Sequence, residues 1–285
     1  MGRGDVMATY GLWYFKAQDG NYETFPSAGT PSQLKGRGFT YAIALHSAAK
    51  DGNGNLLYGN IPFSGYSYND GYQNGASLGR WIDSMLKGID YLVVVPVLID
   101  ESNRGVRGIQ YWKGWVDGVY DNTSGYQVGF YWYLENPWQV SGGVVYEEDI
   151  QEISNYIKNK GQQFIWIPYV HDKVNLENTD IKSIANYFTF VFVQPHYYQR
   201  WKEYYTGTLE GTPNEYPYLT RGVDALIEIL NWIWSIPNGY IEMEVDGTIN
   251  SYPELIKRHV SMLQHKRIRW LEIFGHREHT TTMLI

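Results

Sequence analysis

Acidic and apolar residues alternate along residues 240–246. Because the side chains of a strand point alternately to its two faces, three carboxyl groups fall on one face, those of Glu242, Glu244 and Asp246. Carboxyl groups on a buried face cost free energy unless they are hydrogen-bonded or open to ligand and water. The segment is therefore a candidate for chemistry, and the alternative is an edge strand whose acidic face lies in solvent. Glu272 interrupts a later apolar run in the same way.

A further glutamate follows a run of aromatic residues. Glu135 comes directly after residues 130–134, which predict a buried strand. Cleavage of a glycosidic bond requires two carboxyl groups that flank the bond, one as proton donor and the other as nucleophile or as base for water. A glutamate after one strand and another on a later strand would suit that chemistry. We therefore expect Glu135 and either Glu242 or Glu244 to be catalytic.

Aromatic residues make up 16% of the chain, which has 26 Tyr and 11 Trp. Tyr and Trp rings combine an apolar face with a polar edge, and this combination suits ligands that carry both C–H and hydroxyl groups, such as sugars. The alternative is that tyrosine serves mainly as core and wall material. The composition agrees with a carbohydrate ligand without requiring one.

Short apolar or aromatic runs recur along the chain and are bounded by turn residues. They predict strands at residues 10–15, 39–46, 90–99, 127–134, 163–169, 188–194, 239–245 and 269–274. Helical patterns lie between several of them, at residues 76–88, 105–120, 147–160, 181–187, 220–234 and 252–266. The pattern at 105–120 is the least regular, because it is rich in Gly and Trp.

Strands that alternate with helices predict parallel strands joined by crossovers. Eight of them favour an α/β fold of the (β/α)8 TIM-barrel type in a single domain, residues 1–285, over an open doubly wound sheet. The barrel would be irregular, since residues 16–38 show no helical pattern and only residues 275–285 follow the last strand. Active sites of such barrels lie at the C-terminal ends of the strands, where Glu135 and the 240–246 segment would meet.

The charge and the residue types exclude several classes of function. A formal net charge of -7 argues against nucleic acid or an anionic membrane surface as a partner. The chain has no cysteine, which excludes disulfides, thiolate nucleophiles and cysteine-ligated metals. Residues 91–99, the longest strongly apolar run, are too few to cross a membrane, and the N-terminus has no signal-peptide core. We expect no cofactor, because no phosphate loop or dinucleotide fingerprint is found; compartment and oligomeric state stay open.

Four segments carry a resemblance to known proteins: residues 129–132, 164–169, 194–198 and 242–246. In order and spacing they resemble (β/α)8-barrel glycoside hydrolases and, more closely, an uncharacterised family of glycosidase-like barrels with a domain of unknown function. The resemblance implies that Glu135 is the general acid/base and that Glu242 or Glu244 is the nucleophile. We expect carbohydrate contacts from further residues near the strand ends: Tyr131, Tyr133, Trp166, Tyr169, His171, Gln194, His196, Tyr197, Tyr198, Asp246 and Glu272.

Two features depart from a simple assignment. In the best-known branch of the superfamily an asparagine precedes the acid glutamate, whereas here Leu134 precedes Glu135 and Asn136 follows it. Trp166 is as well suited to filling the barrel core as to contacting a ligand.

Two other functions suit the same residues. The first is a carbohydrate-binding or structural barrel without catalysis, which would keep the aromatic residues but lack a properly spaced carboxylate pair. The second is a metal-dependent hydrolase on the same fold, with ligands drawn from His171, Asp172, His196 and Asp246. Bound metal, or loss of activity with a chelator, would favour the second.

Overall fold

A computed structural model describes residues 8–18, 21–47, 49–50, 56–58, 65–97, 108–170, 176–195, 223–245 and 271–274. Each of the eight predicted runs holds one parallel strand: β1 (Tyr10–Gln18), β3 (Tyr41–His46), β6 (Asp90–Val95), β7 (Gln127–Trp132), β8 (Gln163–Trp166), β9 (Phe190–Val193), β10 (Gly239–Val245) and β11 (Leu271–Phe274). The prediction of an α/β fold with parallel strands is therefore confirmed.

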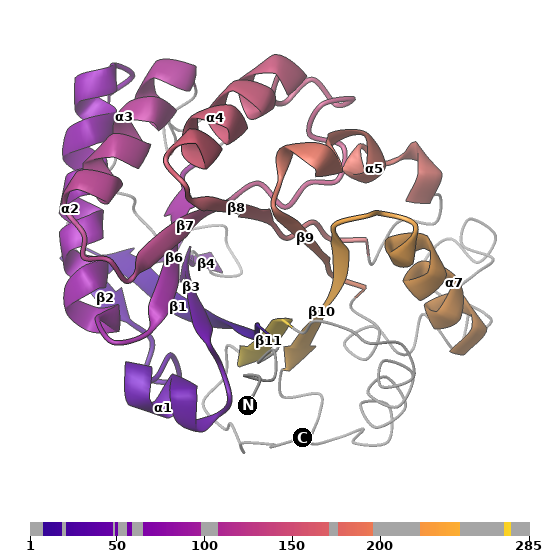
Figure 1. Cartoon of the computed structure of the whole chain (residues 1–285), viewed down its shortest axis with the longest axis horizontal. Coiled ribbons are helices and arrows are strands. Elements are labelled where there is room, and N and C mark those ends of the chain that lie inside the picture. Colours follow the sequence, from indigo (N-terminus) through magenta and orange to yellow (C-terminus); the bar gives the residue numbers. More distant parts are fainter. Residues whose placement is uncertain are drawn as a thin grey trace, which may run out of the picture.

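These strands lie in one sheet with the order β11-β10-β9-β8-β7-β6-β3-β1-β2. The last member, β2 (Asn21–Thr24), runs antiparallel to β1. β1 also pairs in parallel with β11, through Tyr10↔Leu271 and Gly11↔Glu272. β4 (Ala49–Lys50) and β5 (Leu56–Tyr58) form a separate antiparallel pair. Figure 1 shows the strands curving around a centre, with the helices on the outside.

Helices fill most of the intervals in which they are predicted. They are α2 (Tyr68–Leu86), α3 (Ile109–Asp121), α4 (Glu147–Asn159), α5 (Ile181–Ile184) and α7 (Val223–Trp234), with 3₁₀ turns η1 at Leu176–Asn178 and η2 at Ala185–Tyr187. The helix predicted at 252–266 lies outside the described residues. No helix among the residues that the structure describes is long and apolar enough to cross a membrane.

Two helix predictions need correction. Residues 16–38 contain a short helix, α1 (Pro31–Gly36), which begins at a capping box in which Thr30 and Gln33 bond each other's backbone N–H groups. α2 begins eight residues before the predicted start at residue 76. Its first turn is fixed by Ser67 and Asp70, since Asp70 Oδ2 accepts from the Ser67 amide at 3.0 Å and the Ser67 side chain accepts from the Asp70 amide.

The early part of α2 is helical because it packs directly on the backbone of α3. A Cβ atom at Gly71 would lie 2.1 Å from the Tyr111 carbonyl oxygen, and one at Gly75 would lie 2.3 Å from that of Trp115. In the reverse direction, a Cβ atom at Gly114 would lie 2.0 Å from the Tyr68 carbonyl oxygen. Only glycine permits so close an approach of two helices, so these residues mark a helix contact and not a loop.

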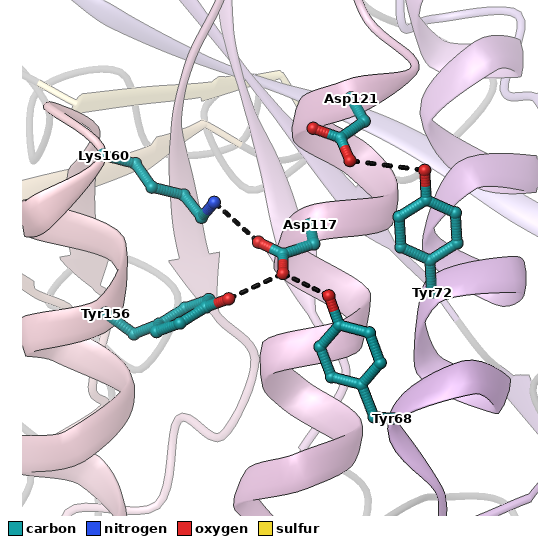
Figure 2. Close-up of polar contacts among 6 residues, drawn as sticks. All are labelled: Tyr68, Tyr72, Asp117, Asp121, Tyr156 and Lys160. Atoms are coloured by element: carbon teal, nitrogen blue, oxygen red, sulfur yellow. Dashed lines mark hydrogen bonds and ion pairs between the residues drawn. The ribbon is translucent and has the colours of Figure 1, made fainter.

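A polar cluster joins this helix pair to α4 (Figure 2). Asp117 of α3 is 9% exposed, and its carboxylate accepts hydrogen bonds from the hydroxyl groups of Tyr68 on α2 and Tyr156 on α4. Lys160, at the end of α4, lies with its Nζ 2.6 Å from Asp117 Oδ1. Burial opposes ionisation of this carboxyl, but the bonds from Lys160, Tyr156 and Tyr68 outweigh it and lower the pKa of Asp117. The cluster therefore stabilises the outer helical layer.

Ring contacts distinguish the inner face of the sheet from its outer face. Tyr10 on β1 donates to Gln163 Oε1 on β8 at 2.9 Å, and its ring lies 5.2 Å from that of Phe192 on β9. Because β1 is not a neighbour of β8 or β9 in the sheet, these contacts must cross the interior. Trp132 on β7 instead contacts Trp112 on α3 at 5.2 Å and therefore lies on the helical side.

Candidate active site

The carboxyl ends of the parallel strands lie at one edge of the sheet, and the structure describes part of the predicted site there. The described residues are Tyr131, Tyr133, Glu135, Trp166, Tyr169, Gln194 and Glu242. The predicted residues that lie outside the described part are His171, His196, Tyr197, Tyr198 and Asp246. Glu244 and Glu272 are described only by their backbone positions in β10 and β11. Glu244 is in register with Ile273, and Glu272 is in register with Met243.

Glu135 is partly buried just beyond β7, where a tyrosine of that strand contacts it. The Tyr131 hydroxyl donates to Glu135 Oε1 at 3.1 Å. The Tyr131 side chain is fully buried, and burial, followed by the charge of Glu135, raises its pKa well above the usual range. Tyr131 therefore remains protonated and acts as a permanent donor to the Glu135 carboxyl group.

Backbone bonds join the ends of β7, β8 and β9 around Glu135. The Tyr169 amide donates to the Glu135 carbonyl oxygen at 3.2 Å, and the Gln194 amide donates to that of Pro168 at 2.9 Å. The Gln194 side chain is 6% exposed and donates through Nε2 to the Ile167 carbonyl oxygen at 3.1 Å. Three predicted site residues, Glu135, Tyr169 and Gln194, are thus brought together, and the Gln194 side chain helps to hold β8 to β9.

Aromatic rings lie beside this group of strand ends. The Tyr169 ring lies 6.4 Å from that of Trp138, which belongs to the turn after β7. Tyr133 is half-buried, and burial together with the Glu135 charge raises its pKa to about 12. These rings are partly accessible and carry polar edges, as a carbohydrate site requires.

Glu242 lies on the inner face of β10 and is 1% exposed. Tyr240, two residues earlier and therefore on the same face, contacts Phe190 at 5.5 Å and Phe192 at 5.8 Å. Both phenylalanines also contact Tyr10, whose bond to Gln163 crosses the interior. The alternation of residues 240–246 thus places the Glu242 carboxyl group on the inner face of the sheet.

The proposed role of Trp166 as a carbohydrate platform needs correction. Its side chain is fully buried, its ring stacks on Phe188 at 5.3 Å, and its Nε1 donates to the Leu134 carbonyl oxygen at 2.7 Å. Strand alternation puts Trp166 on the face opposite to Gln163, which is the helical side. The ring is therefore core material, which is the alternative that its sequence context also allowed.

His46, at the carboxyl end of β3, was not predicted as a site residue. It is 3% exposed, and neither ring nitrogen has a hydrogen-bond partner among the residues that the structure describes. Its ring lies 6.4 Å from that of Tyr133 and 5.4 Å from that of Phe15. Burial lowers its pKa to about 4, so the imidazole is neutral at pH 7. The only signal in the sequence is a histidine that ends an otherwise apolar run.

The structure gives the metal-dependent alternative no support within the residues that it describes. No group of three or more His, Asp or Glu side chains that could hold a metal ion is found among them. The four residues on which that alternative depends, His171, Asp172, His196 and Asp246, lie outside the described ranges.

The fold is similar to several solved structures. Methylornithine synthase matches with a TM-score of 0.50 at 10% identity, over 93% of this chain and 71% of that one. A family 18 chitinase from Crocus vernus matches with a TM-score of 0.47 at 12% identity, over 93% of this chain and 92% of that one. An active-site mutant of a β-1,3-glucanosyltransferase from Rhizomucor miehei, in complex with laminaritriose, matches with a TM-score of 0.43 at 7% identity, over 94% and 86% of the two chains. Identities this low concern the fold alone.

The sequence itself has a much closer relative. Residues 112–231 match the family described as a domain of unknown function, DUF4855. The uncharacterized protein MJ0957 of Methanocaldococcus jannaschii is 40% identical over 283 residues, which cover 85% of this chain and 78% of that protein. The chain therefore belongs to the same protein family as MJ0957, and it carries the DUF4855 match in the region that contains β7, β8 and β9.

Proposed function

We propose that this protein is a glycoside hydrolase that acts on a polysaccharide or glycan, on a (β/α)8 barrel closed by the pairing of β1 with β11. Its catalytic pair is Glu135, after β7, and a glutamate of β10, either Glu242 or Glu244. The observation that supports the proposal is the placement of two glutamates. Glu135 accepts a hydrogen bond from Tyr131 just beyond the carboxyl end of β7, and Glu242 is buried on the inner face of β10, three strands further along the sheet. Two carboxyl groups are what glycosidic cleavage requires, and this placement supports Glu135 and a β10 glutamate as that pair.

The separation of the two carboxyl groups sets the stereochemistry of the product. Retaining enzymes have carboxyl groups about 5 Å apart, so that one of them can attack the sugar carbon directly. Inverting enzymes keep them roughly 6.5–9.5 Å apart, which leaves room for the attacking water. We propose retention, on analogy with the superfamily that the sequence resembles.

The half-buried rings beside Glu135 support a carbohydrate as the ligand. Tyr133 and Tyr169 lie at the strand ends, and Trp138 contacts Tyr169. Their C–H-binding faces and polar edges match the two kinds of surface on a sugar ring. We propose further contacts from the predicted residues that lie outside the described ranges: His171, His196, Tyr197, Tyr198 and Asp246. Glu272 is not among them, because it is in register with Met243 and Gly11, which alternate with the inner-face positions Glu242 and Tyr10.

Hydrolysis of a broad panel of glycans tests the proposal. Wild type is compared with Glu135→Gln, Glu242→Gln and Glu244→Gln, each of which keeps the side-chain shape and removes the ionisable group. Glu148→Gln, on the exposed side of α4, is the matched control for removing one negative charge. We expect wild type and the control to cleave the same glycans, and Glu135→Gln and one β10 variant to lose about 10²–10⁴-fold in rate.

The same panel separates the alternatives. Binding of glycans without cleavage, unchanged in all four variants, would overturn the hydrolase and leave a carbohydrate-binding barrel. Cleavage that a chelator abolishes and the glutamate variants retain would instead point to metal-dependent chemistry. Product analysis by NMR at early times then shows whether the anomeric configuration is retained.

A further inference from the structure

Tyr131 makes a contact that a sugar platform would not make. Its side chain is fully buried, so its ring offers no face to a ligand. Its hydroxyl group is directed to Glu135, at 3.1 Å from Oε1. Tyr131 lies within β7, and Glu135 lies four residues later, where the chain has left the strand. A residue anchored in the sheet thus contacts the carboxyl group of a residue in the loop above it.

The direction of this hydrogen bond favours one protonation state of Glu135. A donor directed at a carboxyl oxygen stabilises the ionised form over the protonated one. The bond is buried on the tyrosine side, where hydrogen bonds to charged groups are stronger than in water. Tyr131 itself does not ionise in the physiological range, because burial and the Glu135 charge raise its pKa well above the ordinary value. The contact is therefore a fixed donor that faces a carboxylate.

We propose that Tyr131 is a positioning residue of this site, which fixes Glu135 and stabilises its ionised form so that Glu135 enters the reaction as nucleophile or base. The proton donor is then a carboxylic acid on β10. Glu242 suits that role by its position, since it lies on the inner face of β10 and is 1% exposed. This assignment rests on the proposed glycoside hydrolase function, and it reverses the roles that the sequence resemblance implies.

By a retaining mechanism, the reaction then proceeds in two steps. The β10 carboxylic acid gives its proton to the glycosidic oxygen as the bond from that oxygen to the anomeric carbon breaks, and a Glu135 oxygen forms a bond to the same carbon. Water next attacks the anomeric carbon, the ester bond to Glu135 breaks, and the β10 carboxylate takes the proton from that water. Under inversion, Glu135 instead takes a proton from the attacking water, which adds directly to the anomeric carbon.

The protonation of Glu135 can be measured without any substrate. The protein is labelled with ¹³C at the glutamate side-chain carboxyl carbon, and the resonance of Glu135 is identified by its absence in Glu135→Gln. We compare its titration in wild type and in Tyr131→Phe, which keeps the buried ring and removes only the hydroxyl group. The expected result is an upward shift of the Glu135 titration by about one to two pH units in Tyr131→Phe.

Tyr133→Phe is the matched control for this titration. It removes the hydroxyl of a second tyrosine near Glu135, one that interacts with Glu135 through its charge and not through a hydrogen bond. Its effect on the Glu135 titration should be much smaller than that of Tyr131→Phe. Should Tyr131→Phe fail to fold, the same question is answered in wild type labelled at tyrosine Cζ. The Tyr131 resonance should then shift at the pH at which Glu135 titrates.

The pH profile of glycan hydrolysis tests the role of Glu135 separately. If Glu135 is the nucleophile or base, Tyr131→Phe moves the acidic limb of kcat/KM upward and leaves the alkaline limb in place. A shift of the alkaline limb alone would make Glu135 the proton donor and overturn the assignment.

The two measurements also separate this inference from the proposed function. An unchanged Glu135 titration in Tyr131→Phe would overturn the positioning role even in an active hydrolase. If the Glu135 titration shifts in Tyr131→Phe but wild type cleaves no glycan, the effect of Tyr131 on Glu135 ionisation is confirmed. The catalytic roles and the proposed function are then overturned together.

Discussion

Two buried titratable groups, Asp117 in the outer helical layer and His46 at the carboxyl end of β3, have opposite environments. On the outside, Asp117 is surrounded by Tyr68, Tyr156 and Lys160, all of which bond it. At the strand ends, His46 is 3% exposed, and neither of its ring nitrogens has a hydrogen-bond partner within the described part of the chain. A buried polar group without a partner lowers stability, whereas a fully bonded one need not. Asp117 therefore adds to the stability of the helical layer, whereas the burial of His46 as a neutral group lowers the stability of the fold.

The histidine gives the largest expected effect on stability. Because its folded pKa, about 4, lies below the unfolded value of 6.5, the unfolded chain binds this proton first as the pH falls. Between pH 6.5 and pH 4 the free energy of unfolding should therefore fall by roughly 3 kcal/mol on account of His46 alone. Its ring neighbours Phe15 and Tyr133 do not titrate in this range.

His46→Phe removes the titrating group and keeps a ring. Urea unfolding at several pH values should show a smaller loss of stability with falling pH in this variant than in wild type. The contributions of the other histidines to this pH dependence cancel in the comparison, because both proteins contain them. Parallel pH dependences in the two proteins would show that His46 is not buried as a neutral group.

Removal of the Asp117 carboxylate should lower the free energy of unfolding by a somewhat smaller amount. Here the cause is the loss of hydrogen-bonding partners, whereas for His46 it is the burial of a group without them. Asp117→Ala leaves two tyrosine hydroxyls and the partly buried Lys160 without their partner, and we expect a loss of about 2–3 kcal/mol in the free energy of unfolding at pH 7. Because the folded pKa of Asp117 lies below its usual value, the stabilisation is present above pH 4 and is lost as the pH falls through the folded pKa.

The neighbouring aspartate is the matched control for Asp117. Asp121 lies on an exposed part of α3 and, among the described residues, accepts one side-chain hydrogen bond, from the Tyr72 hydroxyl at 3.3 Å. Asp121→Ala should therefore cost less than about 1 kcal/mol in urea unfolding. An equal loss of unfolding free energy in the two variants would contradict the stabilising role of the Asp117 cluster that joins α2, α3 and α4.

The smallest of these effects concerns the backbone contact of α2 with α3. Gly75→Ala introduces a methyl group 2.3 Å from the Trp115 carbonyl oxygen, which forces the helices apart. We expect a net loss of about 1–2 kcal/mol, since overpacking outweighs the higher helix propensity of alanine. Gly36→Ala in α1, where a Cβ atom meets nothing within 4 Å, should be neutral or slightly stabilising when both variants are compared with wild type by urea unfolding. Greater stability of Gly75→Ala would contradict the close helix contact.

The eight parallel strands were predictable because each is a short run of apolar residues between turn residues, which is a local property of the sequence. The short antiparallel strands β2, β4 and β5 were not predicted. The start of α2 was not predicted either, since Gly71 and Gly75 are typical of turns until the backbone of α3 lies against them. The same limit applies to the site. Glu135 and Glu242 follow from strand ends and alternation, whereas the roles of Trp166 and His46 depend on which face and how deep the fold buries them.

The most direct test of the central claim is the rate of glycan cleavage by wild type and by Glu135→Gln, measured on the same preparations whose unfolding is recorded. We predict that wild type releases reducing ends from at least one glycan and that Glu135→Gln does so about 10²–10⁴-fold more slowly while remaining folded. Equal rates in the two proteins would contradict the account, as would the absence of cleavage by folded wild type across the panel.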